Sequence, residues 1–156
     1  MSDYQLYLFK QNRSNIIKIL KSFSLEQLNI VPAGLNNNLI WHAGHLLLTH
    51  QFLLYHFTDN PMMVDAEKYM GLYGSGTKPN EKIDQNQIDD LVEALESTTA
   101  QTIQDWKDGK LVKFNGPFTS DYYQITINTP EEALAFNVMH EAFHFGAMTV
   151  IKSALV

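Results

Sequence analysis

Apolar residues recur at intervals of three and four along four segments of the chain, and each such segment is expected to form a helix with one buried face. The pattern predicts helices over residues 3–22, 39–57, 88–109 and 129–156. Ser24 to Gln27 has the form of a capping box and predicts a short additional helical turn. Thr129 to Glu132 has the same form, with proline at the first helical position, and marks the start of the last helix.

Two segments between these helices lack the helical period. Residues 58–85 contain Pro61, "GLYGSG" and "TKPN", and we expect a long loop with one helical turn. In residues 110–128, apolar and polar residues alternate weakly on either side of the turn residues Asn115-Gly116-Pro117. This pattern predicts a short hairpin before the last helix. The sequence therefore predicts a single all-α domain over residues 1–156: a four-helix bundle with a long crossover loop between its second and third helices.

Composition narrows the chemistry that this domain can perform. The chain of 156 residues has no cysteine, so disulfides, zinc-thiolate sites and cysteine nucleophiles are excluded. The formal net charge of −6 gives no basic surface for nucleic acid. No signal-peptide core and no apolar run of about 18 residues is present, so we expect a cytoplasmic protein without a membrane partner.

The segment "HEAFH" (140–144) fits the H-E-x-x-H pattern of zinc proteases. Its two histidines, His140 and His144, lie one helical turn apart on the stripe that faces the interior. A zinc protease of this kind needs a third ligand after the pattern, but the twelve residues that follow, "FGAMTVIKSALV", contain neither histidine nor carboxylate. We therefore predict that the chain is not a protease and that a third ligand lies upstream.

The second helix supplies that ligand. His45 shares an apolar stripe with Trp41 and Phe52, whereas His42 lies about 60° and His50 about 140° away from the stripe at 100° per residue. His45, His140 and His144 are thus the candidate metal ligands, with water at an open fourth position. The alternative is that the histidines are only hydrogen-bonded within a core. Glu141 lies towards the edge of its stripe, and we favour a solvated flank residue over an acceptor that orients a ligand imidazole.

Three stretches carry a resemblance to a known family: "SLEQLNIVPAGLNNNLIWHAGHLL" (24–47), "YGSGTKP" (73–79) and "TPEEALAFNVMHEAFHFGAM" (129–148). Together they resemble the DinB-like superfamily of metal-binding four-helix bundles. The resemblance implies a zinc or nickel ion on His45, His140 and His144, and often a dimer. It also implies metal-dependent transferases that use low-molecular-weight thiols, and some hydrolases. Ala147 stands where the family often has glutamine.

We therefore expect a metal-dependent enzyme that activates a small thiol or water for a small-molecule substrate. The alternative is a non-catalytic metal-binding or stress-response bundle. The expected pocket is lined by Trp41, Phe52, Phe136 and Met148, with residues 58–85 as a lid. We also expect a homodimer, because five apolar residues of the second helix leave the His45 stripe and need a cover: Leu39, Ala43, Leu46, Leu47 and Leu54. The alternative is that the first helix or the long loop over residues 58–85 covers them.

Overall fold

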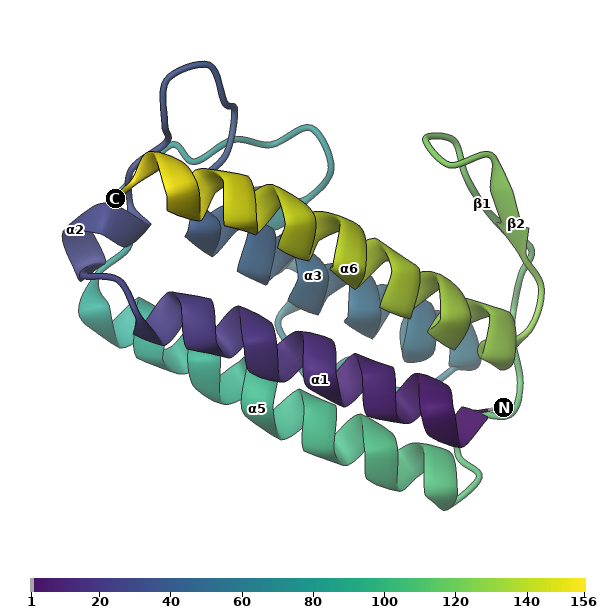
Figure 1. Cartoon of the computed structure of the whole chain (residues 1–156). Coiled ribbons are helices and arrows are strands. Elements are labelled where there is room, and N and C mark those ends of the chain that lie inside the picture. Colours follow the sequence, from purple (N-terminus) through teal and green to yellow (C-terminus); the bar gives the residue numbers. More distant parts are fainter. Residues whose placement is uncertain (1) are drawn as a thin grey trace.

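The computed structural model describes residues 2–156, and four long helices make up most of it (Figure 1). These are α1 (Ser2–Lys21), α3 (Leu39–Leu54), α5 (Gln85–Lys107) and α6 (Pro130–Ala154). The shorter elements are α2 (Leu25–Leu28), the 3-10 helix η1 (His56–Thr58), α4 (Ala66–Tyr73), and the antiparallel strands β1 (Phe118–Ser120) and β2 (Ile125–Ile127). The chain is mostly helical with a small hairpin, as the sequence predicts.

Helices α5 and α6 each pack against both α1 and α3, and α1 and α3 also contact each other. In Figure 1, α1 and α6 run in one direction, and α3 and α5 run in the other. The segment between α3 and α5 therefore returns along the bundle, and it contains η1 and the eight-residue helix α4. Residues 58–85 are thus more ordered than the loop with a single helical turn that the sequence predicts.

Capping side chains mark the two helix starts for which the sequence predicts a capping box. At α2 the predicted capping box is present, because Ser24 and Gln27 each accept from the other's backbone N–H. At α6 the prediction is half right. The Thr129 hydroxyl accepts from the Glu132 N–H at 3.1 Å, but the Glu132 carboxylate accepts from the N–H of Asn128, one residue before the cap.

Helix α3 is buried around most of its circumference. It begins where Asn38 Oδ1 accepts from the Trp41 N–H, and it ends at Leu54, three residues before the predicted position. The five apolar residues that were expected to need a partner chain are fully buried within this chain: Leu39, Ala43, Leu46, Leu47 and Leu54. The expectation of an uncovered face is therefore wrong, because α1, α4, α5 and α6 all contact α3. The homodimer stays a prediction.

Two hydrophobic clusters fill the interior, one towards the α2 end of the bundle and one towards the hairpin. Buried polar residues separate the two clusters along the helices. We call these residues the polar level: Arg13, His50, Asn137 and Glu141. None of the helices in residues 2–156 combines the length and apolarity that crossing a bilayer requires.

Candidate metal centre

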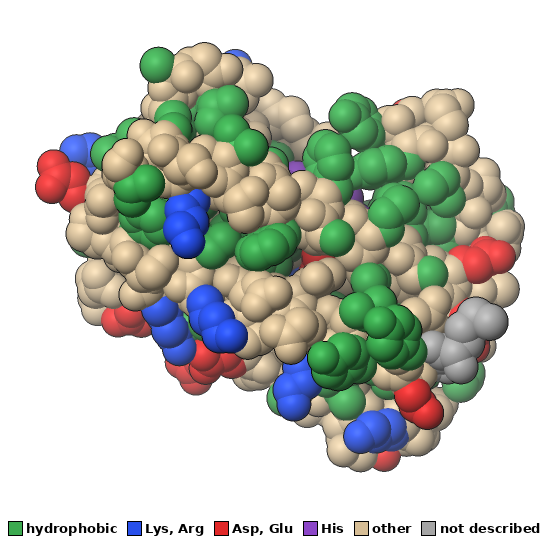
Figure 2. All heavy atoms as spheres, viewed as in Figure 1, with side chains coloured by type: hydrophobic (Ala, Val, Ile, Leu, Met, Phe, Trp, Pro, Cys, Tyr) green, Lys and Arg blue, Asp and Glu red, His purple; other side chains and the backbone are tan. Residues whose placement is uncertain are grey.

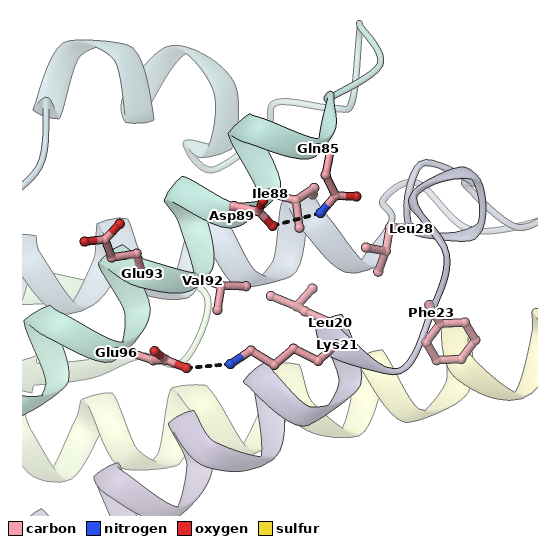
Figure 3. Close-up of a pocket in the computed structure, with 10 residues that line it drawn as sticks. All are labelled: Leu20, Lys21, Phe23, Leu28, Gln85, Ile88, Asp89, Val92, Glu93 and Glu96. Carbon is pink, nitrogen blue, oxygen red and sulfur yellow. Dashed lines mark hydrogen bonds and ion pairs between the residues drawn. The ribbon is translucent and has the colours of Figure 1, made fainter.

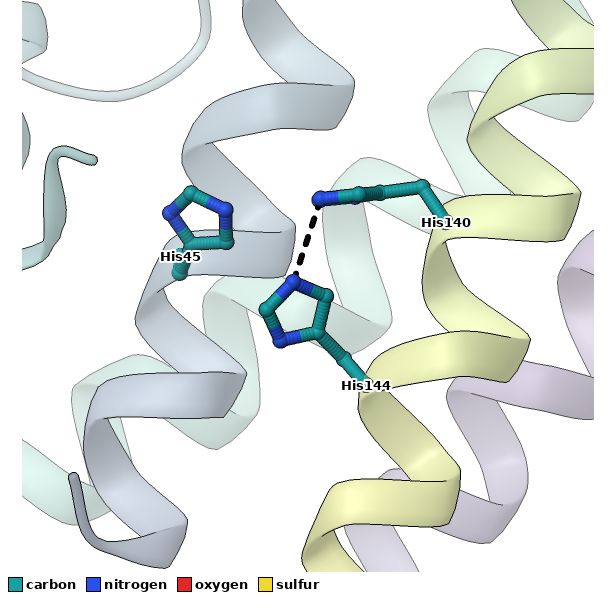
Figure 4. Close-up of side chains that lie close together, drawn as sticks. All are labelled: His45, His140 and His144. Carbon is teal, nitrogen blue, oxygen red and sulfur yellow. Dashed lines mark hydrogen bonds between the residues drawn. The ribbon is translucent and has the colours of Figure 1, made fainter. Parts of the chain in front are cut away.

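Three histidines from two helices meet beside this polar level (Figure 4). His45 comes from α3, and His140 and His144 come from successive turns of α6. One ring nitrogen from each lies within 4.8 Å of the other two. The Nε2 atoms of His140 and His144 are 3.1 Å apart. The structure thus brings together the three residues that helical spacing selected, in an arrangement that can hold a metal ion.

The ring of His45 is held by contacts outside the cluster. Its Nδ1 lies 2.8 Å from the carbonyl oxygen of Tyr73, so Nδ1 carries the proton and donates. Nε2 is then left with a free lone pair, as a metal ligand requires. The ring also stacks on Trp41, with centroids 4.8 Å apart and planes 7° apart. Tyr73 belongs to α4, so the long α3–α5 connection fixes the orientation of this imidazole.

Close packing at Gly44 brings Tyr73 to that position. A Cβ atom on residue 44 would lie 2.5 Å from the Tyr73 ring, so only glycine leaves room for the ring against α3. The Gly44-His45 pair is thus explained by packing: the glycine admits the residue whose carbonyl orients the neighbouring histidine.

A fourth histidine joins the cluster, contrary to the expectation from the helical wheel. His42 is buried, and its Nδ1 lies 2.8 Å from Nδ1 of His144. The deviation of about 60° from the stripe did not remove His42 from the interface, because α6 packs across a wide face of α3. When His144 donates to His42, its Nε2 lone pair is directed towards His140.

The imidazoles are neutral at neutral pH. Burial and the nearby histidines lower the pKa of His140 to about 3 and that of His144 to about 2. Burial and His45 lower the pKa of His42 to about 4. The pKa of His45 is lowered by burial, against the opposing effect of the Tyr73 carbonyl. Neutral imidazoles suit a divalent cation, because binding it requires at most a change of tautomer and no net release of a proton from the rings.

Glu141 is not the solvated flank residue that we favoured. It is fully buried, and its Oε1 accepts from Nε of Arg13 at 2.8 Å and from Nδ2 of Asn137 at 3.0 Å. Burial raises the pKa of Glu141, and the guanidinium of Arg13 opposes that rise. Arg13 also donates to the carbonyl of Leu46, the residue after His45. The carboxylate is thus committed to an ion pair behind the cluster, which supports the prediction against a protease.

A cavity of about 820 Å³ is lined by the histidine cluster and by aromatic residues. Trp41, Phe52 and Phe136 line it, as the sequence predicts. Met148 does not, because its side chain is fully buried in the hydrophobic cluster nearer α2. Figure 2 shows histidine atoms between two lobes of the surface that carry hydrophobic side chains. His45, which lines the cavity, is only partly buried, so the cluster is reached from outside.

The hairpin covers more of this cavity than the predicted lid does. Residues 118–123 all line it, whereas the α3–α5 connection contributes only Met70 and Ser75. Tyr123 packs edge-on against Phe136 and Phe143 of α6, with centroids 5.5 and 5.9 Å away. The hairpin immediately precedes α6, and these contacts of Tyr123 with α6 hold it over the cavity.

A second cavity, of about 420 Å³, lies between the end of α1 and the start of α5 (Figure 3). Apolar side chains such as Leu20 and Val92 line its interior, and an exposed Lys21–Glu96 ion pair of 2.8 Å crosses its edge. No histidine is found among the described residues that line it. This cavity is separate from the metal centre.

The mostly helical fold and the histidine cluster at its cavity place this protein among helical proteins that can hold a metal ion between their helices. A family model described as the DinB superfamily matches residues 8–148, a range that includes all three histidines. The chain belongs to the DinB superfamily. No curated protein matches the sequence.

Proposed function

We propose that this protein holds one divalent transition-metal ion within its four-helix bundle and uses it to activate a small thiol or water. The observation that carries the proposal is the meeting of three neutral imidazole nitrogens within 4.8 Å at a cavity. A set of imidazole ligands suits zinc or nickel better than magnesium or calcium, which prefer oxygen ligands. Three protein ligands leave an open coordination position, as in catalytic rather than structural zinc sites.

His45, His140 and His144 would hold the ion, while Tyr73 and His42 would fix the rings of His45 and His144. A bound divalent ion supplies Lewis-acid chemistry, because it lowers the pKa of a thiol or water that reaches its open position. The chain has no cysteine, so a thiol nucleophile would have to come from a second small molecule. The aromatic walls would exclude bulk water from the reacting groups.

Metal content tests whether the protein holds one divalent ion on these three histidines. Untagged protein is loaded with zinc, desalted and analysed by elemental mass spectrometry, and we expect about one ion per chain. His45→Ala should lose the metal. His56→Ala is the matched control, because His56 is an exposed histidine just after the same helix. Equal metal content in the two variants would contradict the ligand set.

Turnover tests whether the bound ion activates a thiol or water. Zinc- and nickel-loaded protein is incubated with small thiols and a chromogenic aryl halide, and separately with chromogenic esters in water. Activity that His45→Ala abolishes would support the enzyme. Full metal content without turnover of any substrate would favour the alternative, a non-catalytic metal-binding bundle.

A further inference from the structure

The charge of the cavity walls limits which ligands can reach the histidines. The lining residues of the 820 Å³ cavity include seven aromatic side chains beside the histidines: Trp41, Phe52, Phe118, Tyr122, Tyr123, Phe136 and Phe143. Hydroxyl and amide groups supply most of the remaining polar atoms. None of the 11 lysine and arginine residues of the chain is among the lining residues, and Asp121 is the only acidic residue among the described residues that line the cavity.

An anionic ligand would therefore lose hydration without gaining a cationic partner from the walls. The nearest buried cation in the polar level, Arg13, is already paired with Glu141 at 2.7 Å. The net charge of −6 and the Asp121 carboxylate add further repulsion of anions. Ligands that carry carboxylates are thus disfavoured everywhere in the cavity except at the metal position itself.

The walls favour a ring-containing ligand instead. Phe143 is 50% exposed and Tyr122 is 78% exposed, so their aromatic surface at the cavity is available to a ligand. The hydroxyl and amide side chains of the lining, such as Asn37 and Thr49, can accept a hydrogen bond from a ligand N–H or O–H.

We infer that the cavity takes an uncharged, ring-containing small molecule with an N–H or O–H donor, and that it discriminates against anionic ligands. This inference rests on the proposed function for its location, because the ligand would share the cavity with the metal ion. It also refines that function. Low-molecular-weight thiols that carry carboxylates would be poor partners for this chain, so water or an uncharged thiol becomes the favoured nucleophile.

A matched pair of probes tests the inference: 2-naphthol, and 6-hydroxynaphthalene-2-sulfonate, which adds one negative charge to the same ring system. Binding of each is measured by calorimetry, with and without zinc. Without zinc, we expect 2-naphthol to bind about tenfold more tightly or better, because the sulfonate then has no cation to replace its hydration. Equal or tighter binding of the sulfonate to the zinc-free protein would overturn the inference.

Variants locate the effect on the cavity walls. Asp121→Lys places a cation on the wall and should raise sulfonate affinity. Glu93→Lys makes the same change in charge on α5, none of whose residues lines the cavity, and should leave the preference unchanged. Phe143→Ala should weaken 2-naphthol binding by about fivefold through loss of aromatic contact. An unchanged preference in Asp121→Lys would contradict the role of the walls.

The zinc-free measurement separates this inference from the proposed function. If the protein fails to bind zinc, the proposed function fails, while the two probes still report the charge preference of the walls. If zinc binds and the zinc-free protein nevertheless prefers the sulfonate, the metal centre stands and the ligand class is wrong.

Discussion

Both ring nitrogens of His144 face another histidine. Nδ1 lies 2.8 Å from Nδ1 of His42, and Nε2 lies 3.1 Å from Nε2 of His140. A metal ion on Nε2 requires a proton on Nδ1, and His42 is placed to accept that proton in a hydrogen bond. Partners of this kind fix the tautomer and orientation of a ligand imidazole.

His42→Ala should therefore weaken zinc binding by about 10- to 100-fold without removing the site, in line with the effect of losing such partners elsewhere. His42→Asn retains an acceptor close to the ring position and should recover part of the affinity. Competition with a chromophoric chelator measures the dissociation constants. Wild-type affinity in His42→Ala would show that the His42–His144 contact does not orient the ligand.

The Arg13–Glu141 ion pair gives a second prediction at this scale. Both side chains are almost completely buried, so Glu141→Gln leaves an uncompensated charge in the core and should lower the free energy of unfolding by about 3–5 kcal/mol. Glu96→Gln, which breaks the exposed pair with Lys21, should cost less than about 1 kcal/mol. Urea denaturation compares the two, and equal losses would contradict a buried, energetically coupled pair.

Single residues also show what the sequence could and could not predict. His140 and His144 share a face because of the helical period, and His45 was found from the apolar stripe around it. The sequence wrongly placed His42 outside the cluster and Glu141 at the solvent. A helical wheel gives the direction of each side chain around the helix axis, but not how much of the helix surface the neighbouring helices cover. The burial of Glu141 depends on Arg13, which is 128 positions away in the sequence.

At the scale of elements, α4 connects the long α3–α5 segment to the metal centre. Its last residue, Tyr73, lies against Gly44 and accepts from His45. Gly44→Ala should displace α4, lower stability and weaken zinc binding, since the added methyl group would lie 2.5 Å from the ring.

Gly71→Ala is the matched control for Gly44→Ala. Gly71 lies within α4 with nothing within 4 Å of an added Cβ, so alanine there should preserve zinc affinity and raise stability by up to about 1 kcal/mol. Thermal unfolding and zinc titration measure both variants. A Gly44→Ala protein with wild-type zinc affinity would remove α4 from the account of the site.

The long helices were predictable because periodic apolar residues and capping side chains mark them over many turns. Helix α4 was expected only as one helical turn, because its sequence, "AEKYMGLY", contains a glycine and is too short for a clear period. The hairpin was predicted from alternation and turn residues, but its position over the cavity is a tertiary property. Local pattern does not determine where a hairpin packs.

At the scale of the whole molecule, buried neutral histidines make stability depend on pH. His50 is fully buried in the polar level, with Nε2 2.9 Å from the Thr102 hydroxyl. Burial and the charge of Arg13 hold the pKa of His50 well below its ordinary value of 6.5. Below pH 6.5 the unfolded chain therefore takes up a proton that the folded chain does not, and stability falls as pH falls.

Replacing His50 with glutamine isolates this effect. Between pH 6.5 and 5.5, the metal-free wild type should lose about 1 kcal/mol more than His50→Gln does, because the unfolded imidazole is already half protonated at pH 6.5. At lower pH the difference should approach about 1.4 kcal/mol per pH unit, the value for one whole proton. The other buried histidines act in the same direction in both proteins, so they cancel in the difference. Urea unfolding at pH 7.5, 6.5 and 5.5 gives the slopes, and parallel slopes would mean that His50 is not the responsible group.

The central claim is that His45, His140 and His144 together hold one metal ion. Anomalous diffraction from crystals of zinc-loaded protein, recorded on both sides of the zinc absorption edge, tests it most directly. The account predicts one strong peak per chain, within coordination distance of a nitrogen from each of the three histidines. A peak elsewhere, or no peak at this cluster in fully zinc-loaded protein, would contradict it.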